Sequence, residues 1–255
     1  MSGLSAVGLV GALGLAIGSF LNVCIYRLPR GESVVSPPSR CPSCGRELRW
    51  FENVPVLGYL LLGGRCRTCR AAVSPMYPIV EAGTAVLFVL QYWQLGWQPL
   101  LGVRLVFVAA MVVLFVIDLQ HRILPNVITL PGVVVGVAAS FLFAPGWLAS
   151  ILGVAAGGGV LWVVGEAYFR IRGEEGMGMG DVKMLAMIGA FLGWQLMLVT
   201  LLIASLTGSM FGGGMILLDR GGMKYALPLG SFLAAGALIA THVGQPLLSW
   251  YLGFY

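Results

Sequence analysis

The stretch GMGMGDVKMLAMIGAFLG, residues 176–193, places an aspartate, Asp181, between a glycine-rich run and an apolar segment. The chain has only two other aspartates, Asp118 and Asp219. A carboxylate at the edge of hydrocarbon is costly and usually has a function. The stretch therefore predicts a membrane helix with a functional acid near its start.

The rest of the chain has the composition of a polytopic membrane protein. Of 255 residues, 58% are hydrophobic and 10% are charged, whereas soluble domains carry about 25% charged residues. Uncharged segments of membrane-spanning length recur from end to end. They predict an all-α membrane protein with about eight transmembrane helices, near residues 4–26, 78–95, 99–118, 127–143, 147–169, 184–194, 196–218 and 227–245.

We expect three segments along the chain. The first transmembrane helix occupies residues 1–26, a cytosolic loop with four cysteines occupies 27–76, and a seven-helix membrane core occupies 77–255. The first helix lacks a preceding basic segment and runs longer than the core of a signal peptide, so we interpret it as a retained anchor.

The basic residues predict the orientation of these helices. The net charge is +5, and every lysine or arginine except Arg104 falls in alternate loops of the eight-helix arrangement. Because basic loops remain in the cytoplasm, the charge reflects topology and does not call for a nucleic-acid partner. A single span over 184–218 would move Arg220 and Lys224 to the opposite side, so we expect two spans there.

Four cysteines form two CxxC pairs, with Cys41 and Cys44 in the first and Cys66 and Cys69 in the second. Two such pairs supply four thiolates for a tetrahedral zinc site of the ribbon type. Disulfides are uncommon in the reducing cytoplasm, where we expect this loop. Four protein ligands leave no position for water, so the zinc is interpreted as structural. Unrelated thiols or two redox pairs are the alternative.

Asp118 and Asp181 both fall at the expected cytoplasmic membrane boundary. Asp181 alone is compatible with a helix N-cap, but Asp118 ends an apolar helix, where the dipole repels anions. Two carboxylates brought close cannot both ionise easily, so one retains a proton, as in aspartic proteases. The glycines at 176, 178 and 180 are expected to allow positive φ and a close approach of substrate.

The segment GMGD at 178–181 has the GxGD form of intramembrane aspartic proteases. More narrowly, the chain resembles bacterial type IV prepilin peptidases, the leader peptidase/N-methyltransferases, over nearly its whole length. The segments that carry the resemblance are GSFLNVCIYRLPRGESVVSPPSRCPSC (18–44), SPMYPIVEAGTA (74–85), FVIDLQHRILPN (115–126) and EGMGMGDVKMLAMIGAFLGW (175–194).

The resemblance implies that Asp118 and Asp181 form the catalytic dyad. Leu124 stands where the family usually has isoleucine, and Asn126 where aspartate is common; neither is a dyad position. The first implied reaction removes the basic leader from type IV prepilins and from the pseudopilins of type II secretion, at the cytoplasmic face of the bacterial inner membrane. The second methylates the new N-terminal amine with S-adenosylmethionine as methyl donor.

The residues that bind S-adenosylmethionine are not assigned by the sequence. No glycine-rich nucleotide fingerprint is visible after a strand. Ser19 and Asn22, which share a helix face, are candidates, as are Glu52 and Asn53 in the cysteine loop. Ser19 and Asn22 are equally interpretable as partners in interhelical hydrogen bonds.

Three further polar residues are left without a role. Glu81 lies in the second expected span, and Arg104 is either its ion-pair partner or snorkels to the interface. His121 follows Asp118 by three residues and either tunes that acid or is a bystander. The oligomeric state is not indicated.

Other classes of function make different predictions. A proton-coupled transporter would also use intramembrane acids, but it predicts an inverted repeat with broken helices in both halves, which the sequence lacks. A peptidase without methyltransferase activity is the closer alternative, and the intact cysteine loop is the feature that favours the bifunctional enzyme. A scaffold for pilus assembly would not need two acids at one membrane depth.

Overall fold

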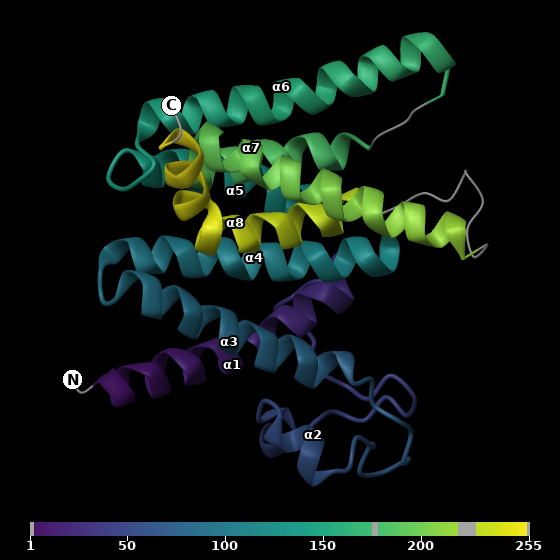
Figure 1. Cartoon of the computed structure of the whole chain (residues 1–255). Coiled ribbons are helices and arrows are strands. Elements are labelled where there is room, and N and C mark those ends of the chain that lie inside the picture. Colours follow the sequence, from purple (N-terminus) through teal and green to yellow (C-terminus); the bar gives the residue numbers. More distant parts are fainter. Residues whose placement is uncertain (1–2, 175–177, 219–227, 254–255) are drawn as a thin grey trace. The chain divides into compact units, whose positions relative to one another are not determined.

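The computed structural model describes residues 3–174, 178–218 and 228–253 (Figure 1). Arg220 and Lys224, on which part of the topology argument depends, lie outside these residues. The chain forms two compact units, Met1–Val113 and Leu114–Tyr255, and each is described by itself. The three segments expected from the sequence remain a prediction.

The regular structure is helical, as expected. The α-helices are α1 (Gly3–Arg27), α2 (Leu57–Leu61), α3 (Met76–Leu95), α4 (Pro99–His121), α5 (Asn126–Ser140), α6 (Trp147–Arg172), α7 (Met179–Leu217) and α8 (Leu229–Leu252). Within the described ranges, five of them (α1, α4, α6, α7 and α8) are long and apolar enough to cross a membrane. The protein is therefore a multi-pass membrane protein, and the total of about eight crossings stays a prediction.

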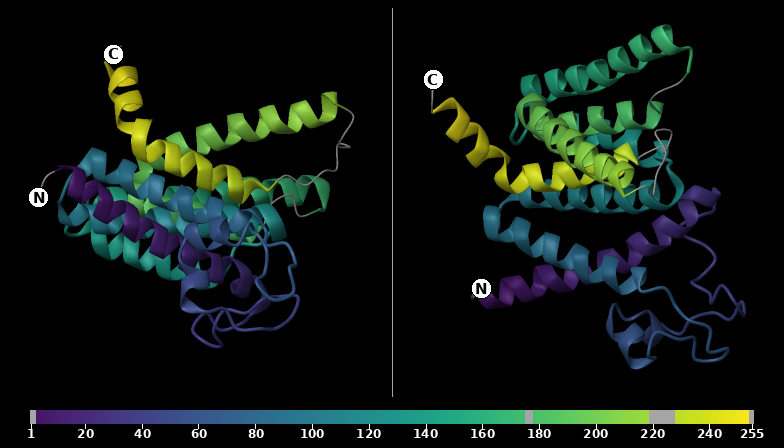
Figure 2. Two further views of the ribbon diagram at one scale, coloured as in Figure 1. Left: turned by 90° about the horizontal axis from the view of Figure 1, so that it is seen from below. Right: turned by 45° about the vertical axis from the view of Figure 1, so that its right-hand side comes forward.

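Helix α7 consists of two helical segments that meet at Gly193. The φ of 79° and ψ of 169° at Gly193 are non-helical, and a Cβ added there would lie 2.9 Å from the Cβ of Pro145. Figures 1 and 2 show the ribbon of α7 reversing direction between its two halves. The halves correspond to the two helices expected at 184–194 and 196–218, and the break falls where only glycine is tolerated.

In the first unit, α1 and α3 pack through small residues. A Cβ added at Gly14 would lie 2.5 Å from Cα of Ala85, and one at Gly18 would lie 2.7 Å from Cα of Glu81. Two glycines four residues apart thus let the backbones approach closely, as membrane helices often do. The close approach holds Glu81 against the C-terminal half of α1.

In the second unit, α6 and α7 pack by the same means. Gly153 and Gly189 face each other so closely that a Cβ added to either would collide with the backbone of the other. One turn away, the Oγ of Ser150 donates a hydrogen bond of 2.8 Å to the carbonyl oxygen of Ala190. This seam orients the first half of α7, whose first turn contains Asp181.

We predict that Gly153→Ala weakens this unit, because the new methyl group forces α6 and α7 apart. The free energy of unfolding should fall by roughly 1–3 kcal/mol, the usual cost of overpacking. Gly159→Ala on the same helix is the matched control, since a Cβ there meets nothing within 4 Å. Thermal unfolding of the purified protein in detergent measures both, and equal shifts would contradict the seam.

Candidate functional site

Asp118 lies in the last turn of α4 and is 5% exposed. Its Oδ2 accepts two hydrogen bonds from Ser231, one from the backbone N–H at 2.6 Å and one from Oγ at 2.8 Å. Ser231 is the third residue of α8, so its N–H is among the donors that a helix N-terminus leaves unpaired. The N-terminus of α8 thereby offsets the unfavourable dipole at the end of α4.

Asp181 lies in the first turn of α7, as its third residue and not as its N-cap. Its backbone N–H donates to the carbonyl oxygen of Gly178 at 3.1 Å, and its side chain is partly exposed. Leu124 links the two acids, because its side chain lies against Gly180, which precedes Asp181, and against Gly230, which also lies against Cγ of Asp118. The two acids singled out from the sequence thus meet at one end of the second unit.

The glycines before Asp181 act differently from the expectation. Gly178 and Gly180 do not have positive φ, so that part of the expectation is wrong, and Gly176 lies outside the described residues. Gly180 is instead needed for packing, because a Cβ there would lie 3.0 Å from the Cβ of Leu124.

Leu124 also packs beside the first acid. A Cβ added at Gly230, at the start of α8, would lie 2.9 Å from Cδ1 of Leu124 and 3.0 Å from Cγ of Asp118. The side chain of Leu124 therefore fills the space between the first turns of α7 and α8. This apolar contact holds the two helix starts that carry Asp181 and Ser231.

Two other polar residues near the acids, Lys183 and His121, form no hydrogen bond to either acid among the described residues. Lys183 Nζ donates a hydrogen bond of 3.0 Å to Oδ1 of Asn126, joining the starts of α7 and α5. His121 is exposed, and no hydrogen bond within the described part of the chain joins it to Asp118. The bystander interpretation of His121 therefore fits the structure better.

Ser231 was missed by the sequence analysis. It is separated from Asp118 by 113 positions, and a serine in the first turn of an apolar helix is common. Pro228, three residues before Ser231, is typical of a helix start, but it does not indicate a contact with an acid. Only the packing of α8 shows that its donors meet an acid.

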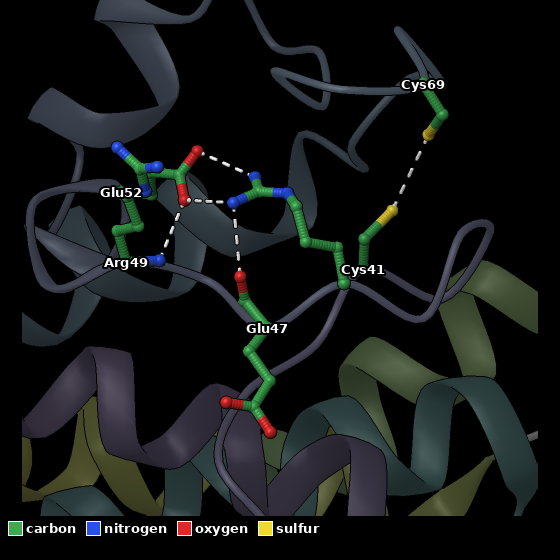
Figure 3. A network of polar contacts seen from close by, with 6 residues as sticks. Cys41, Glu47, Arg49, Glu52 and Cys69 are labelled. Carbon is green, nitrogen blue, oxygen red and sulfur yellow. Dashed lines mark hydrogen bonds and ion pairs between the residues drawn. The ribbon is translucent and has the colours of Figure 1, made fainter.

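In the first unit, the four predicted cysteines converge. Their Sγ atoms all lie within 4.8 Å of one another, and those of Cys41 and Cys69 are 3.8 Å apart (Figure 3). A tetrahedron with zinc–sulfur distances of about 2.3 Å has sulfur–sulfur edges of about 3.8 Å. The geometry therefore fits a tetrahedral metal ion.

The two CxxC turns have the same backbone structure. The N–H of Cys41 donates to the carbonyl of Arg46, and that of Cys66 donates to the carbonyl of Ala71, both at 2.9 Å. Backbone N–H groups of Cys69 and Thr68 lower the pKa of the Cys66 thiol to about 6. At Cys66 these backbone groups thus favour the thiolate, the form that binds metal.

Arg46 and Glu52 form an ion pair beside the cysteine cluster (Figure 3). Both terminal nitrogens of Arg46 donate to the Glu52 carboxylate, at 3.0 and 2.8 Å, and the guanidinium also lies against the Cys66 sulfur. The ion pair with Arg46 lowers the pKa of Glu52. The Glu52 side chain is only 1% exposed, so its carboxylate is committed to this contact.

A cavity of about 780 Å³ lies between the cysteine loop, the second half of α1 and the start of α3. Ser19, Asn22, Glu52 and Asn53, the four candidates for the methyl-donor site, all line it. Asn22 also donates a hydrogen bond of 3.1 Å to the carbonyl of Tyr77. The interhelical interpretation is therefore confirmed for Asn22.

Glu81 also lines the cavity, but it does not form the considered ion pair with Arg104. The three ion pairs in the described part of the chain are Arg40–Glu47, Arg46–Glu52 and Arg170–Glu166. Glu81 Oε2 instead accepts a hydrogen bond of 2.7 Å from the backbone N–H of Val56. The acid turns towards the cysteine loop because α1 packs against the backbone of α3 at this position.

Two family models match the chain. The bacterial peptidase A24 N-terminal domain matches residues 12–95, and the type IV leader peptidase family matches residues 105–213. The first match contains the cysteine cluster and most of the cavity lining, and the second contains Asp118 and Asp181. No solved structure matches the chain.

Curated relatives match it over most of its length. The prepilin leader peptidase/N-methyltransferase of Pseudomonas aeruginosa is 36% identical over 95% of this chain and 92% of its own. The protein of the same description from Aeromonas salmonicida is 38% identical over 96% of this chain and 93% of its own. The chain therefore belongs to the type IV prepilin leader peptidase/N-methyltransferase family, peptidase A24.

Proposed function

We propose that the protein cleaves the leader of type IV prepilins and pseudopilins at the cytoplasmic face of the bacterial inner membrane, and then methylates the new N-terminal amine. The observation that carries the peptidase half is the meeting of Asp118 and Asp181 at one end of the second unit. The alternation of basic loops supports the cytoplasmic side. Family membership over nearly the whole chain supports both activities.

The aspartate pair performs the hydrolysis by sharing one proton. Ser231 donates two hydrogen bonds to Oδ2 of Asp118. In this mechanism Oδ1 is therefore the oxygen that exchanges protons with water. The ionised acid takes a proton from water, whose oxygen bonds to the scissile carbonyl carbon, while the protonated acid gives its proton to the carbonyl oxygen. Collapse of this intermediate breaks the C–N bond, and the leaving amine takes a proton from the pair.

The cysteine cluster serves as a closed structural site in this proposal. Zinc bound to Cys41, Cys44, Cys66 and Cys69 would hold both CxxC turns together, and four protein ligands leave no position for a reacting water. The loop between α1 and α3 has little apolar core, so metal binding would contribute to its folding. S-adenosylmethionine, when bound, supplies the methyl group that replaces one proton of the new amine.

We predict that Asp118→Asn and Asp181→Asn each abolish leader removal while the protein still inserts in the membrane. Neither amide can accept the proton of the attacking water. The purified variants are incubated with a prepilin and labelled S-adenosylmethionine, and leader release and methyl incorporation are followed together. Normal cleavage by either variant would exclude the dyad.

Ser231→Ala is expected to slow cleavage by about 10- to 100-fold, mainly in kcat, because a hydrogen bond to a charged group contributes about 1.5–3 kcal/mol. The KM for prepilin should change little, since Ser231 orients Asp118 and need not touch the substrate. Ser249→Ala on the same helix is the control, because Ser249 is exposed and bonds only its own helix at Pro246. A KM effect with unchanged kcat would contradict the positioning role.

Cys41→Ser is expected to release the metal. The unaltered protein should contain about one zinc per chain by atomic emission, and the variant should contain far less, with faster proteolysis between α1 and α3. Substituting Cys24, which is buried in α1 away from the cluster, is the control. Equal zinc content in Cys41→Ser and the unaltered protein would exclude the four-cysteine site.

A further inference from the structure

The cavity in the first unit contains two buried charges of opposite sign that lack a charged partner. Arg27, in the last turn of α1, is 9% exposed, and Glu81 of α3 is 7% exposed. Both line the cavity. Neither takes part in the ion pairs found among the described residues. Burying a charge without a counter-charge is costly, so the pair indicates a ligand that carries both signs.

Each of the two groups is held in place through backbone contacts. Arg27 donates to the carbonyl oxygens of Ser33 at 2.8 Å and of Pro37 at 2.6 Å. Glu81 accepts the N–H of Val56 through Oε2 only. Hydrogen bonds to neutral groups fix the orientation of the side chains but leave their charges uncompensated.

The loop that meets Glu81 is strained. Val56 has a φ of 59° and a ψ of −49°, and the N–H of Leu57 donates to the carbonyl of Pro55 at 2.6 Å. This is a γ-turn with positive φ, a rare and strained conformation, here at a β-branched residue. Strain of this kind persists where surrounding contacts enforce it and concentrates at ligand sites. The Glu81 carboxylate is one of the contacts that hold this turn, because it accepts the N–H of Val56.

The remaining lining suits a nucleoside with an amino-acid tail. The volume of about 780 Å³ lies within the range of roughly 300–1,000 Å³ typical of cofactor sites. Tyr59 and Tyr77 add aromatic surface to the wall, and aromatic rings attract both flat bases and cations. Glu52 is excluded as a ligand group because Arg46 already holds it.

We propose that this cavity is the S-adenosylmethionine site, with Arg27 binding the carboxylate of the methionine portion and Glu81 facing its ammonium and sulfonium charges. The inference rests on the methyltransferase half of the proposed function. It assigns the site to the first unit, keeps Ser19, Asn22 and Asn53 of the four candidates that the sequence suggested, and adds Arg27 and Glu81.

The first test locates the ligand without any substitution. The purified full chain is irradiated with ultraviolet light in the presence of methyl-labelled S-adenosylmethionine, digested and mapped. Label is expected on peptides within residues 16–81 and should be displaced by unlabelled S-adenosylhomocysteine. Displaceable label confined to peptides from residues 114–253 would overturn the assignment.

The second test measures binding by calorimetry. Glu81→Gln retains an acceptor for the N–H of Val56, and it should weaken S-adenosylmethionine binding at least tenfold; Arg27→Met should do the same. Both variants should release the prepilin leader within about twofold of the unaltered rate. Glu47→Gln is the control, because Glu47 belongs to the same unit but lies on the cysteine loop, is exposed and does not line the cavity. Unchanged affinity in Glu81→Gln and Arg27→Met would overturn the proposal.

A ligand that lacks the charges of S-adenosylmethionine distinguishes the loss of specific charge contacts from a general distortion of the cavity by the substitutions. 5′-Methylthioadenosine lacks the carboxylate, the ammonium and the sulfonium, so the unaltered protein and both variants should bind it equally. If both variants lose affinity for it as well, the charge assignment is wrong. If the unaltered protein cleaves prepilin but neither binds nor uses S-adenosylmethionine, the methyltransferase half of the proposed function fails instead.

Discussion

The hydrogen bonds from the first turn of α8 to Asp118 are the interaction on which the aspartate site depends. A carboxylate in the last turn of an apolar helix is opposed by the dipole of that helix. The N–H and Oγ of Ser231 supply what α4 cannot, namely two donors and the positive end of another helix dipole. Both contacts go to the same oxygen, Oδ2 of Asp118.

Small residues bring the functional groups of each unit into position. Gly14 and Gly18 let α1 approach α3, which turns Glu81 towards the cysteine loop. Gly153 and Gly189 bring α6 against the half of α7 whose first turn contains Asp181. In a membrane, where lipid offers as much apolar contact as another helix, close packing of this kind replaces the hydrophobic effect as the source of specificity. The glycines therefore contribute to function through geometry.

The first unit contains two kinds of buried charged residue. Arg46 and Glu52 form an ion pair beside the cysteine cluster. Arg27 and Glu81 are held only by backbone groups and face a cavity. Burying a charge without a counter-charge is costly, and this cost is the basis of the proposed ligand site. In our proposals, the peptidase residues therefore belong to the second unit and the methyl-donor site belongs to the first.

The sequence alone determined the helical class, most helix positions to within a few residues, the four-cysteine cluster and the two acids. Hydropathy, CxxC spacing and a carboxylate in an apolar segment are local signals, and they do not depend on how helices pack. Only the tertiary structure decided that Ser231 meets Asp118, that Gly180 serves packing and has no positive φ, and that Glu81 contacts Val56 and not Arg104. These contacts join residues far apart in sequence, and their residue types are common at such positions. No local pattern distinguishes them, because their partners are chosen by which helix faces can approach closely.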